Sequence, residues 1–426
     1  MKLLINFISK LGVDSVSRLI GFLTLPVITR ALGPEGYGLF SYLFIILSYF
    51  GFFIDFGYLN YGTNKLCDKI DSKTVIGKII SLQILTLIFS FLILIVVAYF
   101  FLDLSKYFML LMFSLTYFSQ LLAIRYYYLA NNKLYFNSMA ELAGQIIYAL
   151  LIFLVFTYSP SVMNLIIFSV IQSLVTSLFL FLPYIRKNKI HINLNIKANL
   201  KTLKEAYKLG LSSKAEGISA SFVILCIGFF LNAQSVGVYN ASYKIYLILL
   251  TVIQGASYTM MPMLLSYVKN KDRNNARRIS LIFYTFIILG IILSAVTYFF
   301  SEIIIMVMFG EQFTASIEIL KIFSFTILII PVWMFLALML LAYNKYNYVL
   351  LVSISSMVFS IILSIFLVNV FGVIGAAFVL PLVSFGTIAV CLYSLGKISK
   401  SENFRLIELF SLRSAFEELS LLLKRS

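Results

Sequence analysis

The first long apolar segment of the chain contains an acidic and a basic residue, Asp14 and Arg18. They are four residues apart in the sequence, so they share one face of a helix. On a helix, Arg18 lies roughly 10 Å from the start of the apolar run 11–32. A charge at that depth is costly in lipid and is typical of a bundle interior or a wet cavity. The pair therefore predicts an interior that handles charged or polar cargo.

Other charged residues in apolar segments fall into two groups by the chemistry they offer. Arg binds a phosphate group through two hydrogen bonds, and Lys binds it as a point charge. The basic candidates for a cargo site are Arg18, Arg30, Arg125, Lys214 and Lys244. Carboxylates can close a gate or titrate during ion coupling. The acidic candidates are Asp14, Asp55, Glu141 and Glu216.

Structural roles compete with these functional ones. Arg125, Glu141 and Lys214 are close enough to span ends to reach the interface with their charged groups. Asp14 and Arg18 can also form a closed pair within their helix. Amide side chains in or near the spans can serve sugar hydroxyls or only join helices by hydrogen bonds. They are Asn60, Asn64, Gln120, Gln145, Gln172 and Gln254.

Several kinds of catalytic site have little support in the sequence. The three cysteines, Cys67, Cys226 and Cys391, are far apart and form no metal-binding spacing. The single histidine, His191, lies in a basic connection. A histidine-based metal site, a Ser/His/Asp triad and a Cys/His dyad are therefore disfavoured. We expect no catalytic residues, no metal ligands and no cofactor, and hence no enzyme.

The elements that must position these residues are membrane-spanning helices. Hydrophobic residues make up 61% of the 426-residue chain and charged residues 12%, against ~45–50% and ~25% in soluble domains. Long apolar runs without alternation predict an all-α integral membrane protein with about twelve spans. The expected spans are 11–32, 38–62, 76–102, 107–130, 138–158, 161–185, 208–231, 237–268, 277–300, 317–342, 347–369 and 373–396.

The net charge of +16 indicates orientation rather than a nucleic-acid partner. Most Lys and Arg residues fall on one side if the N-terminus is cytoplasmic, as the positive-inside rule requires. An even number of spans then places the C-terminus in the cytoplasm as well. No small-residue cleavage site follows the first apolar run, so we do not expect a signal peptide. The sequence predicts a multi-pass protein with no nucleic-acid partner.

A basic connection divides the chain into two halves of six spans. We expect an N-terminal bundle over 1–185, a cytoplasmic linker over 186–207 and a C-terminal bundle over 208–396. Residues 32–40 align weakly with residues 231–239, which favours an internal duplication. Residues 397–426 form an amphipathic cytoplasmic tail, either lying on the membrane or docking to a partner. Prolines interrupt four spans, at Pro26, Pro262, Pro331 and Pro381.

Short motifs resemble bacterial polysaccharide flippases, the O-antigen and capsule repeat-unit translocases of the MATE-like multidrug/oligosaccharidyl-lipid/polysaccharide exporter superfamily. The opening of the chain carries the most specific part of this resemblance. The motifs are Asp14-Ser-Val-Ser-Arg18, Gly21-Phe-Leu-Thr-Leu-Pro26, Thr29-Arg-Ala-Leu-Gly-Pro-Glu-Gly-Tyr-Gly38, Asp55-Phe-Gly57, Tyr61-Gly-Thr63 and Phe371-Gly-Val-Ile-Gly-Ala-Ala377.

This resemblance covers essentially the whole chain and implies a V-shaped bundle with alternating access. The implied cargo is an undecaprenyl-pyrophosphate-linked oligosaccharide of O-antigen, capsule or lipopolysaccharide synthesis. It would be flipped to the outer leaflet of the bacterial inner membrane through a cationic central cavity. The resemblance makes Arg18 the first candidate for binding the cargo in that cavity. The resemblance also implies coupling to H⁺ or Na⁺. It further implies a polysaccharide polymerase and a chain-length regulator as partners, together with membrane lipids.

Two other functions remain as alternatives. A multidrug efflux antiporter of the same superfamily would favour acidic and aromatic cavities, whereas the deep charges here are mainly basic. A membrane glycosyltransferase or polymerase would need catalytic carboxylates or bases and a sizeable loop outside the membrane, and the expected outer loops are short.

Overall fold

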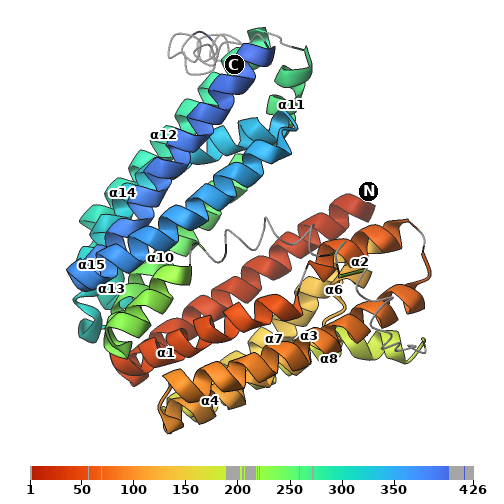
Figure 1. Ribbon diagram of the computed structural model, residues 1–426, viewed down its shortest axis with the longest axis vertical. Coiled ribbons are helices and arrows are strands. Elements are labelled where there is room, and N and C mark those ends of the chain that lie inside the picture. Colours follow the sequence, from red (N-terminus) through yellow and green to blue (C-terminus); the bar gives the residue numbers. More distant parts are fainter. Residues whose placement is uncertain are drawn as a thin grey trace. The chain divides into compact units, whose positions relative to one another are not determined.

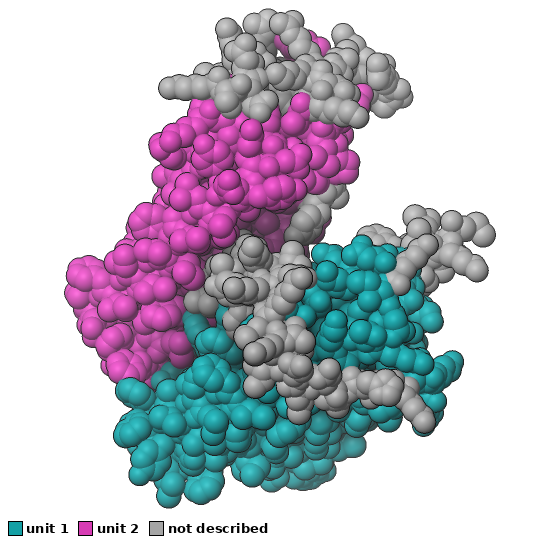
Figure 2. Space-filling model, turned by 45° about the vertical axis from the view of Figure 1, so that its right-hand side comes forward, with its two compact units in different colours: residues 1–214, 308–312 teal, residues 215–307, 313–426 magenta. Residues whose placement is uncertain are grey.

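The computed structural model contains two compact units, each described here by itself. The structure describes residues 2–55, 57–68, 70–188, 202–203, 206, 217, 219, 221–258, 260–270, 273–402 and 417. Unit 1 comprises Met1–Lys214 together with Met308–Gln312, and unit 2 comprises Ala215–Val307 with Phe313–Ser426 (Figure 2). The short segment Met308–Gln312 therefore belongs to unit 1, although the chain on both sides of it belongs to unit 2.

Unit 1 is a bundle of helices in which α1 packs against α7, and α7 packs against α8 (Figure 1). Its helices are α1 Lys2–Ile54, α2 Tyr58–Cys67, α3 Ser72–Phe101, α4 Leu104–Ser114, α5 Thr116–Leu122, α6 Arg125–Ala130, α7 Leu134–Leu151 and α8 Val162–Ile185, with a π-helical turn at Ile152–Phe156. Buried tyrosines tie the helices together: Oη of Tyr117 donates to the Leu47 carbonyl, and Oη of Tyr128 donates to the Leu180 carbonyl, each at 2.7 Å.

Unit 2 is a second helical bundle, in which α14 packs against α10, α12 and α15. Its helices are Ser221–Phe230, α10 Ala233–Tyr258, α11 Met261–Asn270, α12 Arg273–Phe299, α13 Ser301–Met308 up to Val307, α14 Ser316–Ala342 and α15 Tyr346–Glu402. The 3₁₀ turn Glu311–Phe313 begins in the segment of unit 1 and ends at the first residue of unit 2 after it. Phe283, Phe335 and Met339 lie in its buried apolar core, and the rings of Phe283 and Phe335 are 4.6 Å apart.

The all-α fold and the apolar spans confirm a multi-pass membrane protein. Among the described residues, 9 helical segments are long and apolar enough to cross a membrane. Two of these segments, Gly12–Cys67 and Tyr346–Ser399, have 56 and 54 residues, more than twice the ~20 residues that one crossing needs. The count of twelve spans and the cytoplasmic termini stay predictions.

Glycines break the two longest helices, where the sequence predicts connections between spans. Gly33 in α1 has φ 65° and ψ −178°, and Gly372 in α15 has φ 62° and ψ −140°. Residues with a Cβ atom rarely adopt such backbone conformations, so glycine is required at both breaks. Helical structure resumes at once after each, which is why neither predicted connection is a loop.

Two expected spans are interrupted in ways that the hydropathy did not predict. The span expected over 107–130 is divided into α4, α5 and α6, with breaks at Leu115 and at residues 123–124. The span expected over 237–268 ends as a helix at Tyr258, and α11 begins at Met261. Pro262 is therefore the second residue of a new helix, where a proline has no hydrogen bond to lose. Pro26, Pro331 and Pro381 do lie inside helices, as expected.

Two expected segments lie mostly outside the described residues. They are the linker 186–207 and the tail 397–426, including the apolar positions that make the tail amphipathic. One described tail residue, Glu417, forms an ion pair with Arg277 at the start of α12, with Oε2 and Nη2 3.0 Å apart. The domain boundaries expected from the sequence stay predictions.

Candidate functional site

The charged face of α1 is the first part of the candidate site. Arg18 is exposed and Asp14 is half-buried, both in the part of α1 that precedes the break at Gly33. Both residues are described, and no ion pair joins them in this structure. The closed intrahelical pair is therefore not formed, and the Arg18 guanidinium is not neutralised by Asp14. An arginine in this state can bind an external anion through two parallel N–H donors.

Arg30 occupies a more crowded place on the same helix. It is exposed, but its side chain runs beside Gly310 of the segment Met308–Gln312, within unit 1. A Cβ atom on Gly310 would lie 3.3 Å from Cγ of Arg30, and one on Gly33 would lie 2.7 Å from Oε1 of Gln312. Packing thus surrounds Arg30 and the Gly33 break, which suits a positioning role better than a mobile cargo contact.

Asp55 lies in the non-helical break between α1 and α2. Its carboxylate is half-buried, and Gly57 next to it has φ 83°. Tyr58, three residues further on at the start of α2, has a fully buried side chain. A half-buried carboxylate at a helix break is a feasible place for proton or cation exchange.

Arg125 and Glu141 are brought together as an ion pair. Nη1 of Arg125, at the start of α6, lies 3.0 Å from Oε1 of Glu141 on α7. Their side chains are 44% and 45% exposed, so this pair contributes at most about 1 kcal/mol to stability. The sequence suggested a cargo role for one and a gating role for the other, and it gave no sign that they meet.

The remaining candidates come from the C-terminal half of the chain. Lys244 is exposed on α10 of unit 2. The side chains of Tyr239, Tyr243 and Tyr246 stack along the same helix, with neighbouring ring centres 5.9 and 5.8 Å apart. Lys214 and Glu216 lie outside the described residues. Within the described ranges there is no cluster of three or more side chains suited to hold a metal ion.

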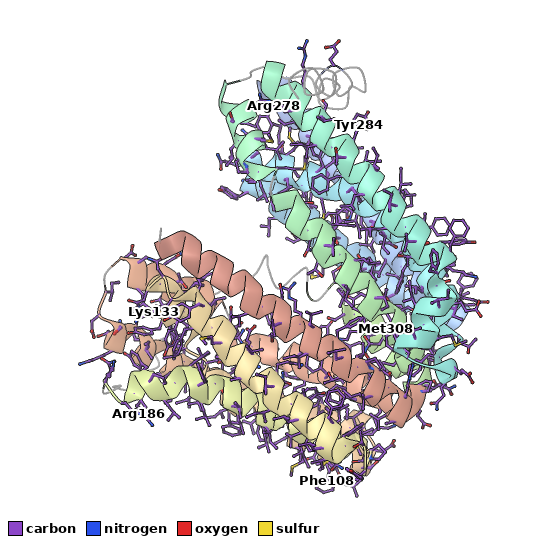
Figure 3. All side chains as sticks on the ribbon, turned by 180° about the vertical axis from the view of Figure 1, so that it is seen from behind. Phe108, Lys133, Arg186, Arg278, Tyr284 and Met308 are labelled. Atoms are coloured by element: carbon purple, nitrogen blue, oxygen red, sulfur yellow. The ribbon has the colours of Figure 1, made fainter. Side chains whose placement is uncertain are left out.

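Labelled side chains mark the two ends of the helical bundle in unit 1 (Figure 3). Lys133 and Arg186 lie at one end of unit 1, and Phe108 lies at the opposite end (Figure 3). The basic residues Lys133 and Arg186 therefore share one end of their bundle.

One polar contact inside the spans was left open by the sequence. Nε2 of Gln172 on α8 donates to Oε1 of Gln145 on α7 at 2.7 Å. The residue types and their apolar surroundings marked both side chains as candidates, but their pairing depends on how α7 and α8 are aligned. The cationic Arg18 and this amide pair are the parts of unit 1 with cargo-binding chemistry.

Comparison with known proteins adds family and fold to these observations. Residues 3–268, more than half of the chain, match the family model described as polysaccharide biosynthesis protein. The chain is 22% identical over 385 residues to the capsular polysaccharide biosynthesis protein CapF of Staphylococcus aureus, covering 89% of this chain and 96% of CapF.

Two solved structures share the fold. The lipid II flippase MurJ in an inward closed conformation superposes with a TM-score of 0.75 at 17% identity, covering 98% of this chain and 93% of MurJ. An inward-facing multidrug resistance MATE family transporter of the MOP superfamily superposes with a TM-score of 0.68 at 12% identity, covering 92% and 99%. The MATE-like fold that the sequence motifs predict is therefore confirmed.

Proposed function

The chain belongs to the polysaccharide biosynthesis protein family, and from this premise we propose that it is a flippase for lipid-linked oligosaccharides. The cargo is an undecaprenyl-pyrophosphate-linked repeat unit, moved from the cytoplasmic to the outer leaflet of the bacterial plasma membrane by alternating access. The observation that carries the proposal is Arg18, an exposed cation inside an apolar span that forms no ion pair with Asp14.

The cations have different parts in this proposal. Arg18 binds the pyrophosphate, because its planar guanidinium matches two phosphate oxygens at once. Lys244 offers a second, point-like charge from α10. Arg30 and Arg125 act through position, since one is packed beside Gly310 and the other is paired with Glu141. Lys214 remains a cargo-binding candidate on sequence grounds alone.

Movement of a charged headgroup through a membrane needs a gate and a source of free energy. Asp14 and Glu216 are placed early in the first span of their halves and are candidates for gating. Asp55, at the break between α1 and α2, is the best-placed carboxylate for coupling to H⁺ or Na⁺. Glu141 is paired with Arg125 and would have to leave that pair to act as a gate. The flipped unit would pass to a polymerase and a chain-length regulator in the outer leaflet.

Efflux of cationic drugs is the alternative that the MATE-like fold allows. It is disfavoured by the chemistry of the site, because an exposed arginine inside a span repels a cationic drug. A glycosyltransferase or polymerase has less support, since the structural neighbours named above are transporters.

Charge replacement at Arg18 and Lys244 tests the proposal. In a host lacking its own copy, Arg18→Glu and Lys244→Glu should each abolish surface polysaccharide, and the lipid-linked repeat unit should accumulate inside. Lys106→Gln is the matched control, because Lys106 pairs with Asp103 at the start of α4, 2.8 Å away, outside the charged face of α1. All three variants should reach the membrane in normal amounts. Normal surface polysaccharide in both charge-reversed variants would disprove the cationic site.

A further inference from the structure

A hydrogen-bonded pair of amides lies near the middle of two neighbouring spans in unit 1. Gln145 is the twelfth residue of α7 and Gln172 the eleventh of α8, so each lies roughly 15 Å from the start of its helix. Both side chains are half-buried. Nε2 of Gln172 donates to Oε1 of Gln145 at 2.7 Å. The pair therefore sits at a depth where lipid offers no hydrogen-bond partners.

The bond between the two side chains leaves three N–H donors and one carbonyl oxygen unused. An amide side chain has two N–H donors and a carbonyl oxygen, and the bond between the two uses one carbonyl and one N–H. Among the described residues, Nε2 of Gln145 and Oε1 of Gln172 have no protein partner, and neither atom is fully buried. Exposing such groups to hydrocarbon costs several kcal/mol each. They are better explained by a polar ligand or a wet cavity in front of them.

Helix α1 approaches the amide pair closely at a glycine. Gly21 on α1 faces Gln145, and a Cβ atom on Gly21 would lie only 3.1 Å from Nε2 of Gln145. Arg18 is three residues before Gly21 on the same helix, so the two positions are neighbours on one face. The cation and the amide pair are therefore adjacent, with a rise of about 4.5 Å between Arg18 and Gly21 along α1.

A purely structural role does not account for the pair, because α7 and α8 are already held together next to it. A Cβ atom on Gly144 would overlap Oγ1 of Thr176 and lie 2.9 Å from the carbonyl oxygen of Gln172. Oγ1 of Thr176 also donates to that carbonyl at 3.0 Å. The close contact at Gly144 fixes the two helices without help from the amides. Interhelical hydrogen bonds of this kind contribute only ~0.6 kcal/mol on average.

We propose that Gln145 and Gln172 bind neighbouring hydroxyl groups of the sugar that is attached directly to the pyrophosphate. Each sugar hydroxyl both donates and accepts, so one hydroxyl can accept from Nε2 of Gln145 while the next donates to Oε1 of Gln172. The inference rests on the proposed function, with the pyrophosphate on Arg18 and the first sugar one helical turn further along α1. It assigns to the amide pair a recognition of the sugar that is separate from the recognition of charge.

Binding to two probes separates sugar recognition from charge recognition. One probe is the lipid-linked repeat unit purified from the host that lacks this protein, and the other is undecaprenyl pyrophosphate without a sugar. The full chain in lipid nanodiscs should bind the first probe more tightly. Gln145→Met and Gln172→Met should each reduce that preference roughly threefold to tenfold, the range for one lost hydrogen bond, and leave the second probe unaffected. Arg18→Gln should weaken both probes alike.

Two more variants control for misfolding and for unspecific effects of amide loss. Asn164→Leu removes another half-buried amide of unit 1, at the start of α8, where its Nδ2 donates to the Ser159 carbonyl at 2.8 Å, and it should leave the preference intact. Gly21→Val places a side chain directly against Nε2 of Gln145 without changing either amide, and it should reduce the preference as well. This second variant keeps the test valid if a glutamine variant fails to fold.

The outcomes distinguish this inference from the proposed function. Loss of sugar preference in the glutamine and Gly21 variants, with bare pyrophosphate binding unchanged, would support it. It would be overturned if the wild type showed no preference for the sugar-bearing probe, or if the variants kept that preference. A host that accumulates no lipid-linked repeat unit, or a wild type that binds neither probe, would instead contradict the proposed flippase function.

Discussion

The longest helix of each unit is broken by a glycine, but the two helices differ in the charged residues that they carry. Helix α1 of unit 1 has 53 residues and α15 of unit 2 has 57, and each is broken once by a glycine with positive φ. Before its break, α1 carries Asp14, Arg18 and Arg30, whereas α15 has no charged residue from Tyr346 to Gly396. Both units therefore bend their longest helix at a glycine, but charged residues precede the bend only in α1.

The two breaks also differ in how they are packed. At Gly33, Oε1 of Gln312 lies 2.7 Å from where a Cβ atom would be, whereas nothing lies within 4 Å of that position at Gly372. The α1 break is enclosed by the segment Met308–Gln312 of unit 1. The α15 break depends only on its own backbone conformation. The bend next to the charged face is therefore the more firmly held of the two.

The difference in charge between α1 and α15 is tested most strongly by placing a charge on α15. Val358 lies in the first half of α15 and is 44% exposed. We expect Val358→Arg to reduce the amount of protein in the membrane severalfold, because an arginine at the centre of a span costs ~2.5–3.5 kcal/mol on insertion. Membrane fractionation measures this, with Val358→Ala as the control. Normal amounts of Val358→Arg would mean that this face of α15 meets water or a polar partner, and the contrast with α1 would fail.

A smaller effect is expected from giving each break a side chain. Gly33→Ala must adopt a backbone conformation that costs about 1–3 kcal/mol for a non-glycine residue, and it must also displace Gln312. Gly372→Ala meets only the backbone cost. Thermal unfolding in detergent should therefore show a larger loss for Gly33→Ala.

A second substitution separates the two costs at Gly33. Shortening Gln312 to alanine should restore part of the loss in a Gly33→Ala/Gln312→Ala double variant. The same Gln312→Ala change should do nothing for Gly372→Ala. Equal losses at both glycines, with no rescue by Gln312→Ala, would show that the packing around Gly33 is unimportant.

The sequence predicted much of the fold, because hydropathy and charge bias act locally. The all-α membrane class follows from long apolar runs, and the bends in α1 and α15 coincide with Gly33 and Gly372. The breaks at Leu115 and residues 123–124 were missed because all these residues are apolar or small and look like a continuous span. Hydropathy measures affinity for lipid and does not register such local changes in backbone direction.

The candidate site was predictable as residue types but not as contacts. Arg18, Arg125, Glu141, Gln145 and Gln172 were all recognisable as polar groups in apolar surroundings. The pairing of Arg125 with Glu141, and of Gln172 with Gln145, depends on the alignment of α6, α7 and α8. That alignment is set by close packing at residues such as Gly144, where the partner on the other helix is distant in sequence.

The smallest expected effect is on stability, and it comes from the residue that caps the start of α3. Oδ2 of Asp71 accepts from the backbone N–H of Thr74 at 3.1 Å and from its hydroxyl at 3.0 Å, so it caps α3 in unit 1. These hydrogen bonds hold the pKa of Asp71 below its usual value of 3.8. The first turn of α15 contains no acidic residue.

A depressed folded-state pKa means that the cap stabilises the folded protein above the unfolded pKa and is lost as the pH falls through the folded pKa. Asp71→Ala should therefore lower the unfolding temperature slightly at pH 7, and the difference from wild type should shrink and disappear as the pH falls below 3.8 and through the lower pKa of the folded protein. Asp68→Ala, an exposed acidic neighbour at the end of α2, is the matched control. A pH-independent difference for Asp71→Ala would assign the effect to helix propensity rather than to the charged cap, and the start of α3 would then resemble the start of α15.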